Sequence, residues 1–99
     1  PKLIGCHFSL SRDDVFRVNG FDENFVGWGY EDDDFARRLY KSGVAPQGVL
    51  EDARALHLWH PTLAPSPLAR RRDRPNRAYF RRWRVPAFCV NGLQKPGST

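Results

Sequence analysis

The order of hydrophobic and polar residues over the first twenty positions predicts a strand followed by a short helix. Residues 3–10 are mostly apolar and include a β-branched residue and an aromatic ring, which is typical of a buried strand. Ser11 is a good N-cap residue, and the acidic residues after it suit the first turn of a helix. Asn19-Gly20 then predicts the helix end, because both residues tolerate left-handed backbone.

Residues 31–42 predict a longer amphipathic helix. The first turn is acidic and the last turns are basic, so the charges complement the helix dipole. Phe35 and Leu39 form an apolar stripe, and Gly43 is the expected residue just past the end. Two ion pairs with i,i+4 spacing are predicted, each worth about 0.3–0.5 kcal/mol: Asp33 with Arg37, and Asp34 with Arg38.

The second half of the chain predicts less regular structure. Residues 53–59 favour another strand. Residues 61–90 combine a proline-rich loop with a basic, aromatic stretch, and residues 76–84 of it predict a helix. Residues 91–99 have the composition of a tail.

The chain has 99 residues, of which 40% are hydrophobic and 27% are charged. This length fits one small domain or a piece of a larger one, and the composition is that of a globular protein. No apolar run approaches the roughly 18 residues that a membrane-spanning helix needs. The first residues lack the apolar region of a signal peptide and do not begin with Met, so we expect a segment of a longer protein. Cys6 and Cys89 have neither CxxC nor metal-site spacing, so no disulfide framework or zinc ribbon is predicted.

Charge is distributed very unevenly between the two halves. Residues 1–52 have a net charge of −4, whereas residues 53–99 have a net charge of +9. A uniformly basic nucleic-acid-binding protein would not concentrate its acidic residues in this way. The distribution favours an active site that places carboxylates near a polyanionic ligand.

The densest chemical feature is Gly27-Trp28-Gly29 followed at once by four acidic residues, 31–34. A tryptophan between glycines lies on backbone that can move, and its ring suits the apolar face of a sugar. Carboxylates at a helix start can point across a cleft, where they accept hydrogen bonds from hydroxyls or act as a general base. The alternative is that these acids simply complement the helix dipole. That alternative explains Asp33 and Asp34 better than Glu31 and Asp32, which have no basic residue at i+4.

These residues, in this order, resemble the acceptor-side segment of GT-A glycosyltransferases. The likeness is to the C-terminal region of β-1,4-galactosyltransferases and to the polypeptide N-acetylgalactosaminyltransferases, and with the histidine segment it covers roughly residues 3–60. The matching positions are Ser9, Ser11-Arg12, Val18-Asn19-Gly20-Phe21-Asp22, Gly27-Trp28-Gly29-Tyr30-Glu31-Asp32-Asp33-Asp34, Arg38-Leu39 and Gly43.

The resemblance implies a role for each residue of the motif. Asp32 matches the general base that deprotonates the acceptor hydroxyl, and Glu31 matches its catalytic and acceptor-binding neighbour. The residues matched to substrate binding are Trp28, Gly29, Tyr30 and Asp33. Tyr30 replaces the glycine usual in galactosyltransferases, which leaves the acceptor open.

His57 and His60 are the candidate metal ligands. If residues 53–59 form a strand, these two histidines do not make an i,i+2 pair on one face, because alternation separates them. A histidine in such a strand is also a common core residue. The resemblance, however, places His57 as a ligand of Mn²⁺ (or Mg²⁺) beside an upstream Asp-x-Asp that this chain does not contain, with His60 as the weaker alternative.

The fold and function that the resemblance implies follow from these matches. The fold class is α/β, with residues 1–60 as the C-terminal acceptor and metal segment of a GT-A, Rossmann-like fold that is incomplete on its own. The intact enzyme would transfer a sugar from a nucleotide-diphosphate donor, a UDP-sugar, to a carbohydrate hydroxyl, whereas the isolated segment would be inactive. The alternative is a non-catalytic fragment that binds saccharide or an anionic surface.

The basic residues 70–84 admit several interpretations. They could form a solvated surface, bind the donor diphosphate through arginine, or attach to an anionic membrane surface. Nucleic-acid binding is least favoured, because no RRM, KH or helix-turn-helix pattern accompanies them. The cysteines and the lack of a visible signal favour a cytoplasmic location, with membrane association as a further option.

Overall fold

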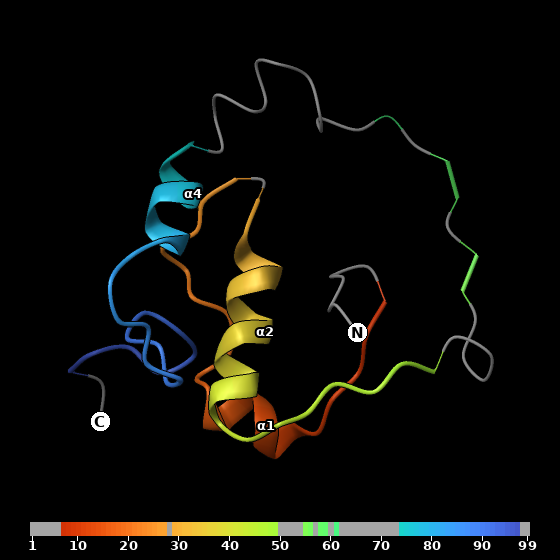
Figure 1. Ribbon diagram of the computed structural model, residues 1–99, viewed down its shortest axis with the longest axis horizontal. Coiled ribbons are helices and arrows are strands. Elements are labelled where there is room, and N and C mark those ends of the chain that lie inside the picture. The colour runs from red at the N-terminus through yellow and green to blue at the C-terminus, as the bar shows by residue number, and fades with distance from the viewer. Residues whose placement is uncertain are drawn as a thin grey trace.

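The computed structural model describes residues 7–27, 29–49, 55–56, 58–59, 61 and 74–97. Its helices are α1 (Arg12–Arg17), α2 (Glu31–Lys41) and α4 (Arg74–Phe80), and Figure 1 shows them on the same side of the molecule. Within the described ranges the backbone forms helices and loops and no strand. Residues 3–6, 53–54 and 57 of the two predicted strands, 3–10 and 53–59, lie outside these ranges, and their described residues are irregular. The α/β class therefore stays a prediction.

Helix α1 begins and ends as the sequence predicts. The Ser11 hydroxyl accepts a hydrogen bond from the backbone N–H of Asp14 at 3.2 Å, which is the interaction of an N-cap. The helix stops at Val18, after which Asn19 and Gly20 both adopt positive φ angles of 63° and 68°. The left-handed pair turns the chain back toward α2.

Helix α2 is also confirmed, with its last residue at Lys41 and its C-cap at Ser42. It starts from Tyr30, which has a φ of 71°, and the first helical bond runs from the Asp34 N–H to the Tyr30 carbonyl at 2.9 Å. Gly43 has a φ of 100°, as expected for the residue that follows the cap.

Helix α4 differs from the predicted range of 76–84, because it begins earlier and ends four residues sooner. Pro75 is accommodated in the first turn, where a helix needs no backbone N–H. After Phe80 the chain makes one more turn, and Arg84 has a φ of 55°, which is incompatible with continuing the helix. No helix in the described part of the chain is long and apolar enough to cross a membrane.

Among the described residues, the apolar core is small and lies between α2 and the end of α1. Val18, Phe35 and Leu39 are buried in it, and Leu10 and Val44 pack against them. The Phe21 ring stacks on Phe35, with centroids 4.3 Å apart. A core of this size leaves much of the remaining cohesion to polar contacts.

The segment after α4 packs against the turn that follows α1. The Asn19 side chain donates to the carbonyls of Cys89 and Gln94 at 2.8 and 3.0 Å, and its Oδ1 accepts the Gln94 N–H at 2.7 Å. The Asn19 carbonyl accepts the Leu93 N–H at 2.9 Å. Residues 91–95, expected to belong to a tail, are therefore held against the body of the molecule.

Gly92 is buried where this segment crosses Asn19. A Cβ added to Gly92 would lie 1.9 Å from the Asn19 carbonyl oxygen and 2.7 Å from the Cys89 sulfur. Because the closest atom belongs to backbone, no side-chain rotation relieves the clash.

Gly92→Ala should therefore lower the free energy of unfolding by about 3 kcal/mol or more, measured by urea denaturation. Gly97→Ala is the matched control, since its added methyl meets nothing within 4 Å and costs only the strain of its φ of 79°, about 1 kcal/mol. Equal losses in the two variants would contradict the close packing at Gly92.

Candidate functional site

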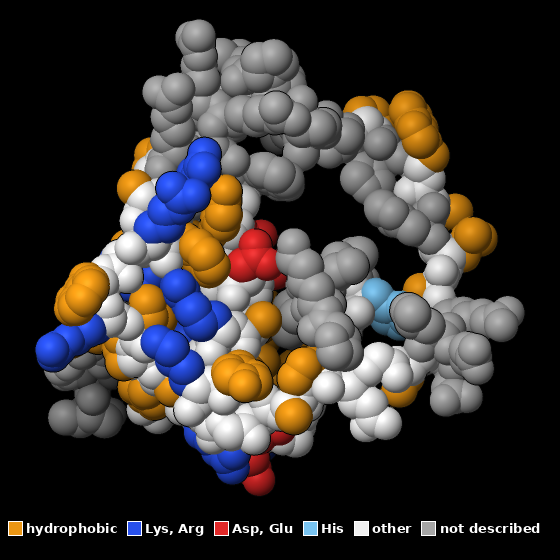
Figure 2. Space-filling model, in the orientation of Figure 1, with side chains coloured by type: hydrophobic (Ala, Val, Ile, Leu, Met, Phe, Trp, Pro, Cys, Tyr) orange, Lys and Arg blue, Asp and Glu red, His pale blue; other side chains and the backbone are white. Residues whose placement is uncertain are grey.

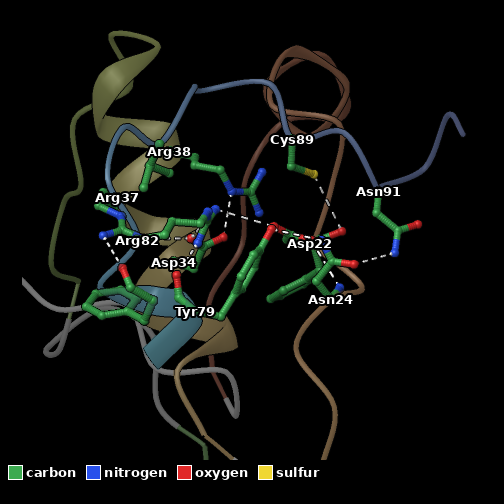
Figure 3. Close-up of polar contacts among 12 residues, drawn as sticks. Asp22, Asn24, Asp34, Arg37, Arg38, Tyr79, Arg82, Cys89 and Asn91 are labelled. Atoms are coloured by element: carbon green, nitrogen blue, oxygen red, sulfur yellow. Dashed lines mark hydrogen bonds and ion pairs between the residues drawn. The ribbon is translucent and has the colours of Figure 1, made fainter. Parts of the chain in front are cut away.

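A fully buried carboxylate, Asp34, lies at the centre of the polar contacts that Figure 3 shows. Its Oδ2 accepts from Arg38 Nε at 2.7 Å, and its Oδ1 accepts from Arg37 Nη2 at 2.8 Å and from Arg82 Nη2 at 3.3 Å. The predicted Asp34–Arg38 ion pair is confirmed. It is not the weak surface pair that its spacing suggests, because both side chains are excluded from solvent.

Arg38 ties α2 to the end of α1. Its Nη1 donates to the Val18 carbonyl at 2.7 Å, and its Nη2 donates to the Gly20 carbonyl at 2.8 Å. Together with the Asp34 bond, these contacts satisfy all three nitrogens of a guanidinium that is fully buried. The side chain thus joins the helix to the turn from which the next loop departs.

Asp22 and Tyr79 join that loop to α4. The Tyr79 hydroxyl donates to Asp22 Oδ2 at 2.6 Å, and Arg82 Nη2 reaches the same oxygen at 3.4 Å. The Arg82 guanidinium also lies over the Tyr79 ring, with its Cζ 3.9 Å from the centroid. Burial, and then the hydrogen bond to Asp22, raise the pKa of Tyr79.

Asn76 of α4 is hydrogen-bonded to the loop that precedes α2. Its Oδ1 accepts the Val26 N–H at 3.1 Å, and its Nδ2 donates to the carbonyls of Val26 and Gly29 at 2.9 and 3.0 Å. The side chain is buried. No short-range pattern in the sequence indicates this role, because the contacts span about fifty positions.

The carboxylates of the predicted site lie on the first turn of α2. Glu31 Oε2 accepts the backbone N–H of Gly29 at 3.1 Å, so this side chain fastens the end of the loop. Asp32 and Asp33 follow, and all three acids are half-buried. Figure 2 shows acidic side chains exposed over the N-terminal part of α2.

The structure places five of the predicted site residues together, on the last loop residues and the first turn of α2: Gly29, Tyr30, Glu31, Asp32 and Asp33. The Tyr30 ring packs against Phe80 of α4, with centroids 5.4 Å apart. Trp28, His57 and His60 lie outside the described residues. Among the residues that are described, no three His, Cys, Asp or Glu side chains gather as a metal site.

The basic residues 77–84, in α4 and just after it, divide into two groups. Arg82 turns inward to Asp22 and Asp34, whereas Arg77, Arg81 and Arg84 are exposed. Figure 2 shows the lysine and arginine side chains gathered over α4 and the segment after it. For Arg82, the structure favours a role in cohesion.

Comparison with known proteins decides the family. A family model described as the N-terminal domain of galactosyltransferase matches residues 1–61, more than half of the chain. The chain belongs to the galactosyltransferase family. This match confirms the galactosyltransferase resemblance seen in the sequence. That residues 1–60 form the acceptor and metal segment of a larger GT-A enzyme stays a prediction.

Individual galactosyltransferases match over shorter stretches. Beta-1,4-galactosyltransferase 4 of Rattus norvegicus is 50% identical over 38 residues, which are 38% of this chain and 11% of the rat protein. The human protein of that name is 55% identical over 31 residues, 31% of this chain and 9% of its own length. Human beta-1,4-galactosyltransferase 3 is 39% identical over 44 residues, 44% of this chain and 11% of its own length. The chain thus spans about a tenth of these galactosyltransferases, and no solved structure matches it.

Proposed function

We propose that this chain is part of a glycosyltransferase that transfers a sugar from a nucleotide-diphosphate donor, a UDP-sugar, to a carbohydrate hydroxyl. Membership of the galactosyltransferase family supports a glycosyltransferase in general. The observation that supports a reaction at this site is the row of half-buried carboxylates on the first turn of α2, directly after a glycine-flanked loop.

Asp32 is the proposed general base. Its carboxylate would take the proton of the acceptor hydroxyl while that oxygen attacks the anomeric carbon, and the diphosphate would leave with the bonding electron pair. Asp33, one position on, would accept a hydrogen bond from the acceptor sugar. Glu31 would act beside Asp32 and keep the loop end in place through its contact with the Gly29 N–H.

The loop residues are the proposed substrate contacts. Trp28 would cover the donor and acceptor, and Gly29 and Tyr30 would line the acceptor side. Tyr30 has its backbone fixed at the helix start and its ring against Phe80. A large ring at this position supports an acceptor different from that of galactosyltransferases with glycine there.

We also propose that the enzyme uses a divalent cation, Mn²⁺ or Mg²⁺, with His57 as one of its ligands and His60 as the weaker alternative. A single neutral imidazole supplies one ligand, so the other protein ligands would come from an Asp-x-Asp elsewhere in a GT-A fold. When bound, the cation would supply positive charge that stabilises the leaving diphosphate. The GT-A fold, the cytoplasmic location and attachment to an anionic membrane surface stay predictions.

Asp32→Asn in the complete protein should lower turnover by roughly 100-fold or more, because it removes the general base without changing the shape of the side chain. Donor binding, measured by titration with a UDP-sugar, should change little. Asp13→Asn is the matched control, since it also neutralises an acid in the first turn of a helix, α1. Near-normal turnover of Asp32→Asn would rule out the assignment.

His57→Ala should shift the Mn²⁺ activation curve of the complete protein to concentrations about 10-fold higher or more, because one metal ligand is lost. His60→Ala should leave the curve in place. A shift in His60→Ala alone would transfer the role to that residue, and no shift in either would remove both histidines from the metal site.

A further inference from the structure

We propose that Asn76 is a positioning residue, which holds the loop before α2 at Val26 and Gly29 in the position that the transfer reaction uses. This inference rests on the proposed function, because that function gives the loop its role. It concerns a residue of α4, outside residues 1–61, which the family model matches. The one side chain contacts both ends of the loop, and its own burial fixes its position.

These three hydrogen bonds involve both the oxygen and the NH₂ group of the Asn76 amide. The carbonyl oxygen of Asn76 accepts from the Val26 N–H, while the NH₂ group donates to Val26 and Gly29 carbonyls. These partners also fix the orientation of the amide. If the amide were flipped, its NH₂ group would face the Val26 N–H and its oxygen would face the two carbonyl oxygens. We call these three hydrogen bonds the Asn76 bracket. An amide of this length supplies both the acceptor and the donors that the bracket needs.

The loop needs such a bracket because its own backbone is permissive. Gly27 and Gly29 both have positive φ angles, 77° and 117°, and a Cβ built at Gly27 meets nothing within 4 Å. Glycines of this kind leave many conformations accessible when nothing external fixes them. With the Gly29 carbonyl held by Asn76 and the Gly29 N–H held by Glu31, the peptide groups on both sides of Gly29, two positions before α2, are fixed.

The same contacts connect α4 to the carboxylates. Glu31 bonds the loop end, and the acids at the start of α2 follow directly. Release of the loop by loss of Asn76 would therefore loosen the acceptor side of the site while leaving Asp32 in the helix. We expect a weaker apparent affinity for acceptor and a smaller change in turnover.

The first test measures the loop itself and needs no catalytic activity. In the complete protein, hydrogen exchange of the Gly29 amide, followed by NMR, reports the end of the loop that Glu31 and Asn76 hold. Asn76→Ala should make this exchange faster. Asn76→Asp should do so more strongly at neutral pH, because it places a carboxylate oxygen against two carbonyl oxygens. Lower pH should reverse part of the Asn76→Asp effect, since a protonated carboxyl can donate.

The second test measures acceptor kinetics. Asn76→Ala should raise the acceptor KM roughly 10-fold, the effect of about one net hydrogen bond, with a smaller change in kcat. Tyr79→Phe is the control, because it removes an α4 hydroxyl that bonds Asp22 and Asn24 but leaves the Asn76 bonds to Val26 and Gly29 in place; it should alter neither the Gly29 exchange nor the acceptor KM.

The outcomes separate the two proposals. Unchanged Gly29 exchange in Asn76→Ala and Asn76→Asp would overturn the bracket, whatever the activity. Faster exchange with an unchanged acceptor KM would overturn its role in positioning. A wild-type protein without glycosyltransferase activity would refute the proposed function, while the exchange results would still decide whether Asn76 holds the loop.

Discussion

The Asp34 carboxylate is buried and accepts hydrogen bonds from three arginines, two on its own helix and one beyond α4. A carboxylate without water is costly unless charged donors surround it, and loss of one partner of such a pair typically costs 3–5 kcal/mol. Arg38 extends the contact to the end of α1, and Arg82 extends it to Asp22 and Tyr79. In the part of the chain that the structure describes, these contacts join α2, the loop before it and the segment after α4.

The four consecutive acidic residues 31–34 at the start of α2 therefore have different roles. Asp34 points inward to the arginines, and Glu31 fastens the loop end. Asp32 and Asp33 lie half-buried on the same first turn, where the proposed chemistry takes place. Such a run could simply complement the helix dipole. Here Asp34 stabilises the structure, Glu31 contacts the loop, and the other two residues are those assigned to the acceptor.

Local signals in the sequence predicted the ends of α1 and α2, the left-handed Asn19-Gly20 and the Asp34–Arg38 pair. Each depends on residues within about four positions of one another. The burial of that pair, the inward turn of Arg82 and the Asn76 bracket depend on contacts between segments about twenty to fifty positions apart, and no short pattern encodes them. The extent of α4 was missed for the same reason, because Arg82 leaves the helical path toward distant carboxylates.

The most direct measurement is urea denaturation of Asp34→Asn beside Asp32→Asn, two neutralised acids in the same helical turn. The account predicts that Asp34→Asn lowers the free energy of unfolding by about 3–5 kcal/mol, because buried arginines lose their charged partner. Asp32→Asn should lower it by about 1 kcal/mol or less, because Asp32 is only half-buried and an acid in the first turn of a helix contributes about 0.3–1 kcal/mol. A small loss for Asp34→Asn, equal to that for Asp32→Asn, would contradict the central place given to the buried carboxylate.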